Sequence, residues 1–193
     1  MARIRIHVLH CGMIGVAPQL PASGQWRWPA KADARRTKAD ARIWLPVSAD
    51  LGRGWYTLVH SVVAPGQSIG EQLAARGIRP RDLDYVLFSH LDPDHIAGIS
   101  EVRGAKRLLV PEEEYFWSCR VNLRYTSRRL WIDEPPERFW YRVNHIGPES
   151  RSYDLFGDDS VHLVHIAGHT EGMFAALIRN GERYVLLNAD GAA

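Results

Sequence analysis

The stretch from Ser89 to Gly98 constrains this chain more than any other part of its sequence. It reads Ser-His-Leu-Asp-Pro-Asp-His-Ile-Ala-Gly and directly follows the apolar run 84–88, which is typical of a buried strand. Carboxylates and imidazoles packed this closely repel one another or leave buried donors without partners, whereas one or two divalent cations satisfy all of them. The stretch therefore predicts a metal site. Its candidate ligands are His90, Asp92, Asp94 and His95.

The composition predicts a single globular domain over residues 1–193. Hydrophobic residues make up 46% of the 193, enough to bury a core. A net charge of +2 with dispersed basic residues gives no support for a nucleic-acid partner. No run approaches the roughly 20 apolar residues of a membrane helix. Two cysteines without a pairing motif, and an N-terminus without a signal-peptide core, favour a reducing cytoplasm.

The order of the expected elements is that of an α/β protein. We expect strands over 3–10, 42–47 and 55–63, with a break at 11–15. A helix is expected over 68–77, because Ser68 can cap it, Glu71 follows three positions later and Gly77 can end it. Strands at 84–88 and 107–110 follow, and then a helix with Pro111 in its first turn. We interpret the glutamates at 112–114 as capping and solvated residues.

The second half of the chain predicts a basic segment and then mostly strands. Residues 121–136 are basic and aromatic, typical of an insertion or lid, whose arginines either bind a carboxylate or phosphate or form a solvated surface. Strands are expected over 138–146, 160–166, 173–179 and 182–189. Asn180-Gly181 between the last two predicts a type I′ hairpin. The arginines are Arg124, Arg128 and Arg129, with Tyr125 and Trp131 nearby.

Two later residues, His169 and Asp190, also lie where expected strands end. Each alone has an ordinary interpretation, His169 as a turn residue and Asp190 as a cap. Together with the first four candidates they make six nitrogen and oxygen ligands, which suit two ions such as zinc, iron or manganese.

These motifs resemble those of the metallo-β-lactamase superfamily. The run 89–98 is similar to its His-x-His-x-Asp-His signature, and Ala-Gly-His-Thr-Glu-Gly at 167–172 and Leu-Asn-Ala-Asp-Gly at 187–191 are similar to its later histidine and bridging-aspartate motifs. The opening Ile-Arg-Ile-His-Val-Leu-His-Cys-Gly resembles the quorum-quenching lactonase branch. The resemblance implies a four-layer αβ/βα sandwich with the site at the sheet edges.

The resemblance also implies roles for the six residues. His90, Asp92 and His169 would hold one metal, Asp94 and His95 would help to hold the second, and Asp190 would bridge them. The two divalent ions, zinc in the first instance, would provide a metal-bound hydroxide that attacks a lactone or related ester, a small-molecule substrate. Asp94 would orient the hydroxide or pass its proton to the leaving group.

This sequence departs from the family pattern at three points. The Asp-Thr-Gly strand end that usually precedes the signature is absent from 50–70. Asp92 stands where the signature has its second histidine, which makes the ligand set harder and favours iron or manganese. The chain ends at Ala193, before the family's last metal-binding histidine, so the second half of the fold is expected to be incomplete. We expect a fragment of a longer enzyme. The alternative is a short chain whose exposed edge is covered by a partner, for example in a homodimer.

Two other classes of function stay open. Diiron redox members of the superfamily carry a carboxylate where Asp92 lies, and an incomplete ligand set is compatible with a non-catalytic protein of the same fold.

Overall fold

The computed structural model describes residues 13–15, 60–62, 65–120 and 123–191. The strands expected over 3–10 and 42–47 lie outside these residues. Strand β2 (His60–Val62) falls within the expected 55–63 segment and pairs antiparallel with β1 (Met13–Gly15). The break expected at 11–15 is therefore wrong for residues 13–15, because a distant segment supplies their ladder partner.

The first described helix, α4 (Ile69–Ala74), forms as its sequence predicts. The Ser68 hydroxyl accepts the Glu71 amide at 3.2 Å, and the Glu71 carboxylate accepts the Ser68 amide at 3.2 Å. These reciprocal bonds satisfy amides that the helix start leaves without partners. Gly77 ends the helical segment with a φ of 70°, a conformation that favours glycine.

A three-stranded parallel sheet with helices around it follows. Its strand order is β3-β4-β5, and the chain runs from β3 through two short helices to β4, and from β4 through a third helix and a 3₁₀ segment to β5. The elements are η1 (Pro80–Asp82), β3 (Tyr85–Leu87), α5 (Pro93–Ile96), α6 (Ile99–Val102), β4 (Arg107–Pro111), α7 (Glu112–Ser118), η2 (Leu123–Leu130) and β5 (Glu137–Phe139). Helix α7 begins one residue later than predicted, because Pro111 still belongs to β4 and pairs with Phe139.

The rest of the chain forms a five-stranded antiparallel sheet in the order β10-β9-β8-β7-β6. Its strands are β6 (Arg142–Val143), β7 (Arg151–Asp154), β8 (Val161–His165), β9 (Phe174–Asn180) and β10 (Arg183–Leu187). The single strand expected over 138–146 is wrong, because β5 ends at Phe139 in the parallel sheet and β6 begins at Arg142 in the antiparallel one.

The predicted β9–β10 hairpin is present, but its turn differs from the prediction. Asn180 pairs with Arg183, so the connecting residues are Gly181 and Glu182. A type I′ turn needs positive φ at both central residues, and in this turn only Gly181, at 63°, has it. The type I′ prediction is therefore wrong.

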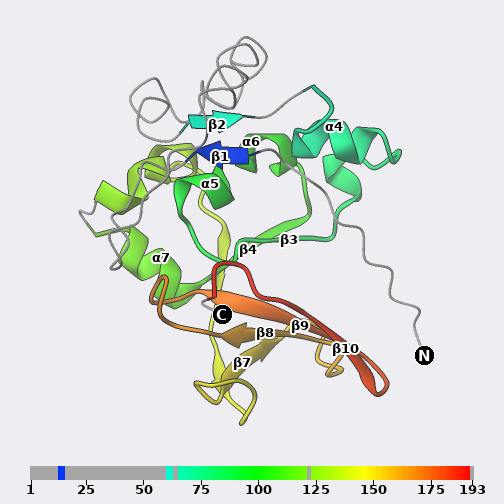
Figure 1. The fold of residues 1–193 in the computed structure, drawn as a ribbon, viewed down its shortest axis with the longest axis vertical. Helices are drawn as coiled ribbons and strands as arrows, with labels where there is room; N and C mark the ends of the chain where they lie inside the picture. The colour runs from blue at the N-terminus through cyan, green and yellow to red at the C-terminus, as the bar shows by residue number, and fades with distance from the viewer. Residues whose placement is uncertain (1–12, 16–59, 63–64, 121–122, 192–193) are drawn as a thin grey trace, which may run out of the picture.

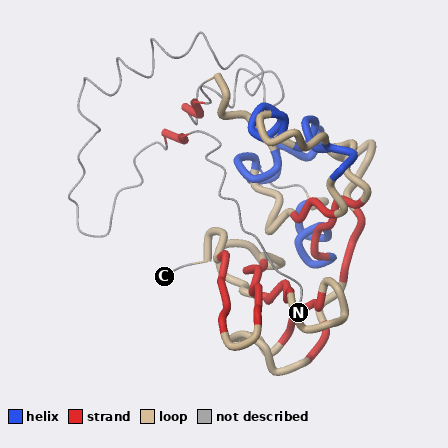
Figure 2. Tube along the Cα trace, turned by 90° about the vertical axis from the view of Figure 1, so that its right-hand side faces the viewer, coloured by secondary structure: helices blue, strands red, loops and turns tan. Residues whose placement is uncertain are grey.

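The elements stack in layers (Figures 1 and 2), with helices α4, α5 and α6 above the parallel sheet and the antiparallel sheet below it. One core lies on the helical side, where Leu91 and Ile96 are fully buried beside Val110. Leu109, adjacent to Val110 on β4, points the other way into a second core with Leu163 of the antiparallel sheet. This period-two alternation lets one sheet face both cores. The arrangement confirms the expected α/β class and supplies three layers of the expected sandwich.

In the described part of the chain, none of the helices combines the length and the apolar character needed to cross a membrane.

Candidate metal centre

The loop that carries the first candidates is fixed from both sides at Leu91. Its side chain is fully buried. Its amide donates to the Glu114 carboxyl at 2.9 Å, and its carbonyl accepts the Ser127 hydroxyl at 3.2 Å. Asp92 then starts α5 as its N-cap, with Pro93 at the first helical position. The backbone between His90 and Asp92 is therefore held by α7 and η2 together.

His90 is the buried centre of the site. Its side chain is 0% exposed, its Nδ1 lies 3.1 Å from the Ser89 hydroxyl, and its Nε2 has no hydrogen-bond partner. Burial, followed by the nearby His95, lowers the pKa of His90 to about 4. A neutral imidazole with a buried ring nitrogen lacking a partner is the form in which histidine binds metal ions.

One group of possible ligands lies on the Asp92 side of His90. Asp92 Oδ2 is 3.6 Å from His90 Nε2 and 3.0 Å from His169 Nε2. The three side chains each offer a ligand atom within 4.8 Å of the others. His169 comes from the loop 167–172, which Tyr141 fixes by donating to the Gly172 carbonyl at 2.7 Å.

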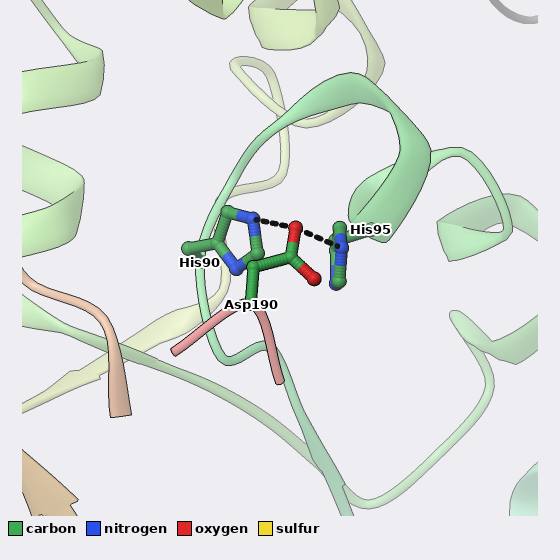
Figure 3. Close-up of side chains that lie close together, drawn as sticks. All are labelled: His90, His95 and Asp190. Carbon is green, nitrogen blue, oxygen red and sulfur yellow. Dashed lines mark ion pairs between the residues drawn. The ribbon is translucent and has the colours of Figure 1, made fainter. Parts of the chain in front are cut away.

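A second group shares His90 with the first and adds His95 and Asp190 (Figure 3). The Asp190 carboxylate sits between two imidazoles, with its Oδ2 at 3.8 Å from His90 Nε2 and 3.3 Å from His95 Nε2. The same oxygen is 3.4 Å from His169 Nε2. Asp190 follows β10 in a turn closed by the Gly191 amide donating to the Asn188 carbonyl at 2.9 Å. One carboxylate oxygen thus lies near three imidazoles.

Asp94 differs from the other five candidates. It lies in the first turn of α5, and its Oδ2 is 3.7 Å from His95 Nε2. It belongs to neither group, and about a third of its side chain, 34%, is exposed. The structure therefore brings five of the six predicted residues together and leaves Asp94 at their edge.

Arg124 of η2 contacts this site through Asp92. Its Nε and Nη2 each donate to a different Asp92 oxygen at 2.6 Å. Burial alone would raise the pKa of Asp92, but the hydrogen bonds and charge of Arg124 outweigh it and lower the pKa. The sequence left open whether the arginines of this segment bind a carboxylate or phosphate or form a solvated surface. Arg124 binds a carboxylate, that of Asp92 in the same chain. The segment is not a solvated lid, since Tyr125 and Trp131 are buried.

Glu114 was missed as a site-shaping residue. We interpreted it as solvated, but its side chain is fully buried beneath the ligand loop. Burial raises the pKa of its carboxyl, and contacts with Thr170 and the Leu91 amide oppose the rise only in part. Glu112 and Glu113 precede it in the same run and are half-buried, so only the helical register separates the fully buried glutamate from them.

A third group, Asp154, Asp159 and His162, lies in the β7–β8 turn. Asp154 accepts the Gly157 and Asp159 amides, at 2.9 and 3.0 Å, and Asp159 pairs with His162 at 3.0 Å. These contacts close the turn and give each of the three side chains a hydrogen-bond partner within it.

The comparisons with known proteins agree with this fold and these motifs. The sequence profile described as the metallo-beta-lactamase superfamily matches residues 48–184. The chain belongs to this superfamily.

Its relatives include proteins named N-acyl homoserine lactonase AttM. The one from Rhizobium radiobacter is 28% identical over 133 residues, covering 68% of this chain and 49% of the relative. The one from Azorhizobium caulinodans is 31% identical over 109 residues, covering 56% and 40%. The chain thus spans about half the length, or less, of these curated relatives.

A solved structure of an N-acyl homoserine lactone hydrolase superposes with a TM-score of 0.52 at 20% identity, covering 67% of this chain and 46% of the other. This likeness shows the shared fold.

Proposed function

We propose that this chain carries the metal centre of a metal-dependent hydrolase that acts on lactones or related esters. The observation that carries the proposal is the convergence of five nitrogen and oxygen ligands, His90 among them, from three separate segments. The buried Nε2 of His90 has no hydrogen-bond partner.

The donor atoms fit divalent cations. Ligands about 2.1 Å from one tetrahedral zinc ion lie roughly 3.4 Å from each other, and the distances from Asp92 and Asp190 to the imidazoles run from 3.0 to 3.8 Å. Imidazole and carboxylate are also the ligand types that zinc, iron and manganese share. His90, Asp92 and His169 would hold one ion, and His95 and Asp190 would hold part of the second.

Such ions, when bound, supply Lewis acidity that lowers the pKa of water and polarises a carbonyl group. The residues of the chain do the rest. Asp190, near three imidazoles, is suited to bridge the two sites. Asp94, at the edge and partly exposed, is suited to accept a proton from water and return it to the leaving alcohol.

Two findings support a lactone as the substrate. The AttM relatives are named N-acyl homoserine lactonases, and the structurally similar hydrolase is described with N-hexanoyl-L-homoserine bound at its catalytic metal center. We therefore place N-acyl homoserine lactones first among the substrates to test.

The purified chain tests the proposal directly. We expect about two equivalents of zinc by elemental analysis, and hydrolysis of N-hexanoyl homoserine lactone that a chelator abolishes. Asp190→Asn should lower turnover by more than about 100-fold, since losing even an outer partner of a metal ligand costs 10–100-fold. The matched control is Asp133→Asn at an exposed position away from the site. Protein that binds no metal, or keeps full activity as Asp190→Asn, would refute the proposal.

A second candidate function, a diiron redox protein, is favoured by one observation. Asp92 adds a hard carboxylate to the His90 and His169 imidazoles. Iron at two equivalents with oxygen consumption and no lactone turnover would support this candidate instead.

A further inference from the structure

The contact between Asp92 and Arg124 sets this site apart from one built of three histidines. The guanidinium binds both carboxylate oxygens at 2.6 Å in a fork geometry. The Asp92 side chain is 11% exposed and that of Arg124 is 36% exposed, so the pair is partly shielded from water. Charge-assisted bidentate bonds of this kind are strong and fix the orientation of both groups.

The position of Arg124 is itself fixed by packing. Tyr125, which follows it in η2, and Trp131, just after η2, belong to the buried core under the ligand loop. Ser127 of the same segment donates to the Leu91 carbonyl. The backbone that carries Arg124 is therefore attached to the loop that carries Asp92.

The fork leaves part of Asp92 available. An ionised carboxylate has about four lone-pair positions on two oxygens, and a guanidinium fork occupies two of them. Oδ2 also lies 3.0 Å from His169 Nε2 and 3.6 Å from His90 Nε2. One oxygen can therefore face the arginine and the two imidazoles at once.

The charges of Asp92 and Arg124 cancel. A carboxylate in place of a neutral imidazole adds one negative charge to the ligand set, and the guanidinium at 2.6 Å adds one positive charge beside it. The sum at this position is again neutral, as it would be with histidine.

We propose that Asp92 and Arg124 act together as a charge-neutral unit that takes the place of a histidine in the metal site. Asp92 provides the oxygen ligand, and Arg124 is a positioning residue that orients the carboxylate and cancels its additional charge. This inference rests on the proposed metal-binding function.

The two residues should consequently be exchangeable only together. Asp92→His alone leaves the guanidinium without its carboxylate next to a dication, and the repulsion weakens binding. The double variant Asp92→His/Arg124→Gln removes that charge and restores a neutral set of three histidines. Asp92→His/Arg129→Gln is the matched control, because Arg129 is exposed on the same segment.

The test is zinc affinity by chelator competition, with metal content and a thermal unfolding curve for each variant. We expect Asp92→His to bind zinc at least about 10-fold more weakly than the parent. The double variant should recover to within a few-fold of the parent, and the Arg129 control should stay as weak as Asp92→His. Unfolding curves of the metal-free proteins separate loss of binding from loss of folding.

Two outcomes would overturn the inference alone: zinc binding by Asp92→His as tight as by the double variant, or a folded double variant that fails to recover. A parent protein that binds no metal would instead remove the proposed function, and the inference with it.

Discussion

The buried carboxyl of Glu114 accepts the amide of Leu91 at 2.9 Å and so connects helix α7 to the loop between His90 and Asp92. The Leu91 amide needs this acceptor, because a buried amide without a partner costs stability. Glu114 therefore shapes the metal site without belonging to it.

Replacing Glu114 tests this connection. Glu114→Ala leaves the Leu91 amide without its acceptor and opens a cavity, so we expect a loss of about 2–4 kcal/mol in the free energy of unfolding. Glu114→Gln keeps an acceptor oxygen on a side chain of nearly the same shape, so we expect its free energy of unfolding to fall by no more than about 1 kcal/mol. Urea unfolding measures both. Equal losses in the two variants would show that the acceptor does not matter.

Gly172 tests a different contact of Glu114, the close approach of its backbone to the loop 167–172. A Cβ at this position would lie 2.1 Å from the Glu114 backbone nitrogen, closer than any real contact. Gly172→Ala should therefore force the two segments apart and destabilise the protein by about 1–3 kcal/mol. Gly104→Ala is the control, since its Cβ would meet Pro80 at an ordinary 3.4 Å. A Gly172→Ala protein as stable as the control in urea would contradict this packing.

Features that depend on neighbouring residues could be predicted from the sequence. The Ser68–Glu71 capping box, the Gly77 stop and the β9–β10 hairpin each depend on residues a few positions apart. The candidate ligands themselves were also predictable, because each follows a strand, β3, β8 or β10. Their convergence across two sheets was implied only by the resemblance of their motifs to the family.

The contributions of Glu114 and Arg124 could not be predicted, because each depends on a contact across the fold. Glu114 looks like its two neighbours until the register of α7 turns it inward. Arg124 contacts Asp92, which lies 32 positions away in the sequence. The sequence of a basic segment does not show whether its arginines bind a ligand or another part of the protein. The split of 138–146 between two sheets is likewise decided by strand partners, which local patterns do not specify.

Replacing Asp94 distinguishes metal binding from proton transfer, the two roles that the motif implies for this residue. Because it lies in neither ligand group, we expect Asp94→Asn to keep most of the bound zinc while kcat falls by about 10²–10⁴, the range for a lost general acid or base. Metal content and lactone turnover on the same preparation decide this. If zinc is lost in proportion to activity, Asp94 acts as a ligand instead.

The burial of His90 predicts how the metal-free protein responds to acid. Its pKa is lowered from 6.5 to about 4 in the folded state, mainly by burial. A folded pKa below the unfolded value means that the unfolded chain takes up the proton first as the pH falls. The stability associated with neutral His90 is therefore present above pH 6.5 and is lost as the pH falls toward 4, by up to about 3 kcal/mol.

Urea unfolding of chelator-treated protein at pH 7 and pH 4.5 measures this loss, and a His90→Gln variant removes the titrating group. We expect the stability difference between the two pH values to be smaller in His90→Gln than in the parent, because glutamine takes up no proton. Groups that do not interact with His90 contribute equally to both proteins and cancel in the comparison. An unchanged difference would mean that His90 is protonated as readily when folded as when unfolded, which its full burial and the nearby His95 ring, with centroids 4.0 Å apart, oppose.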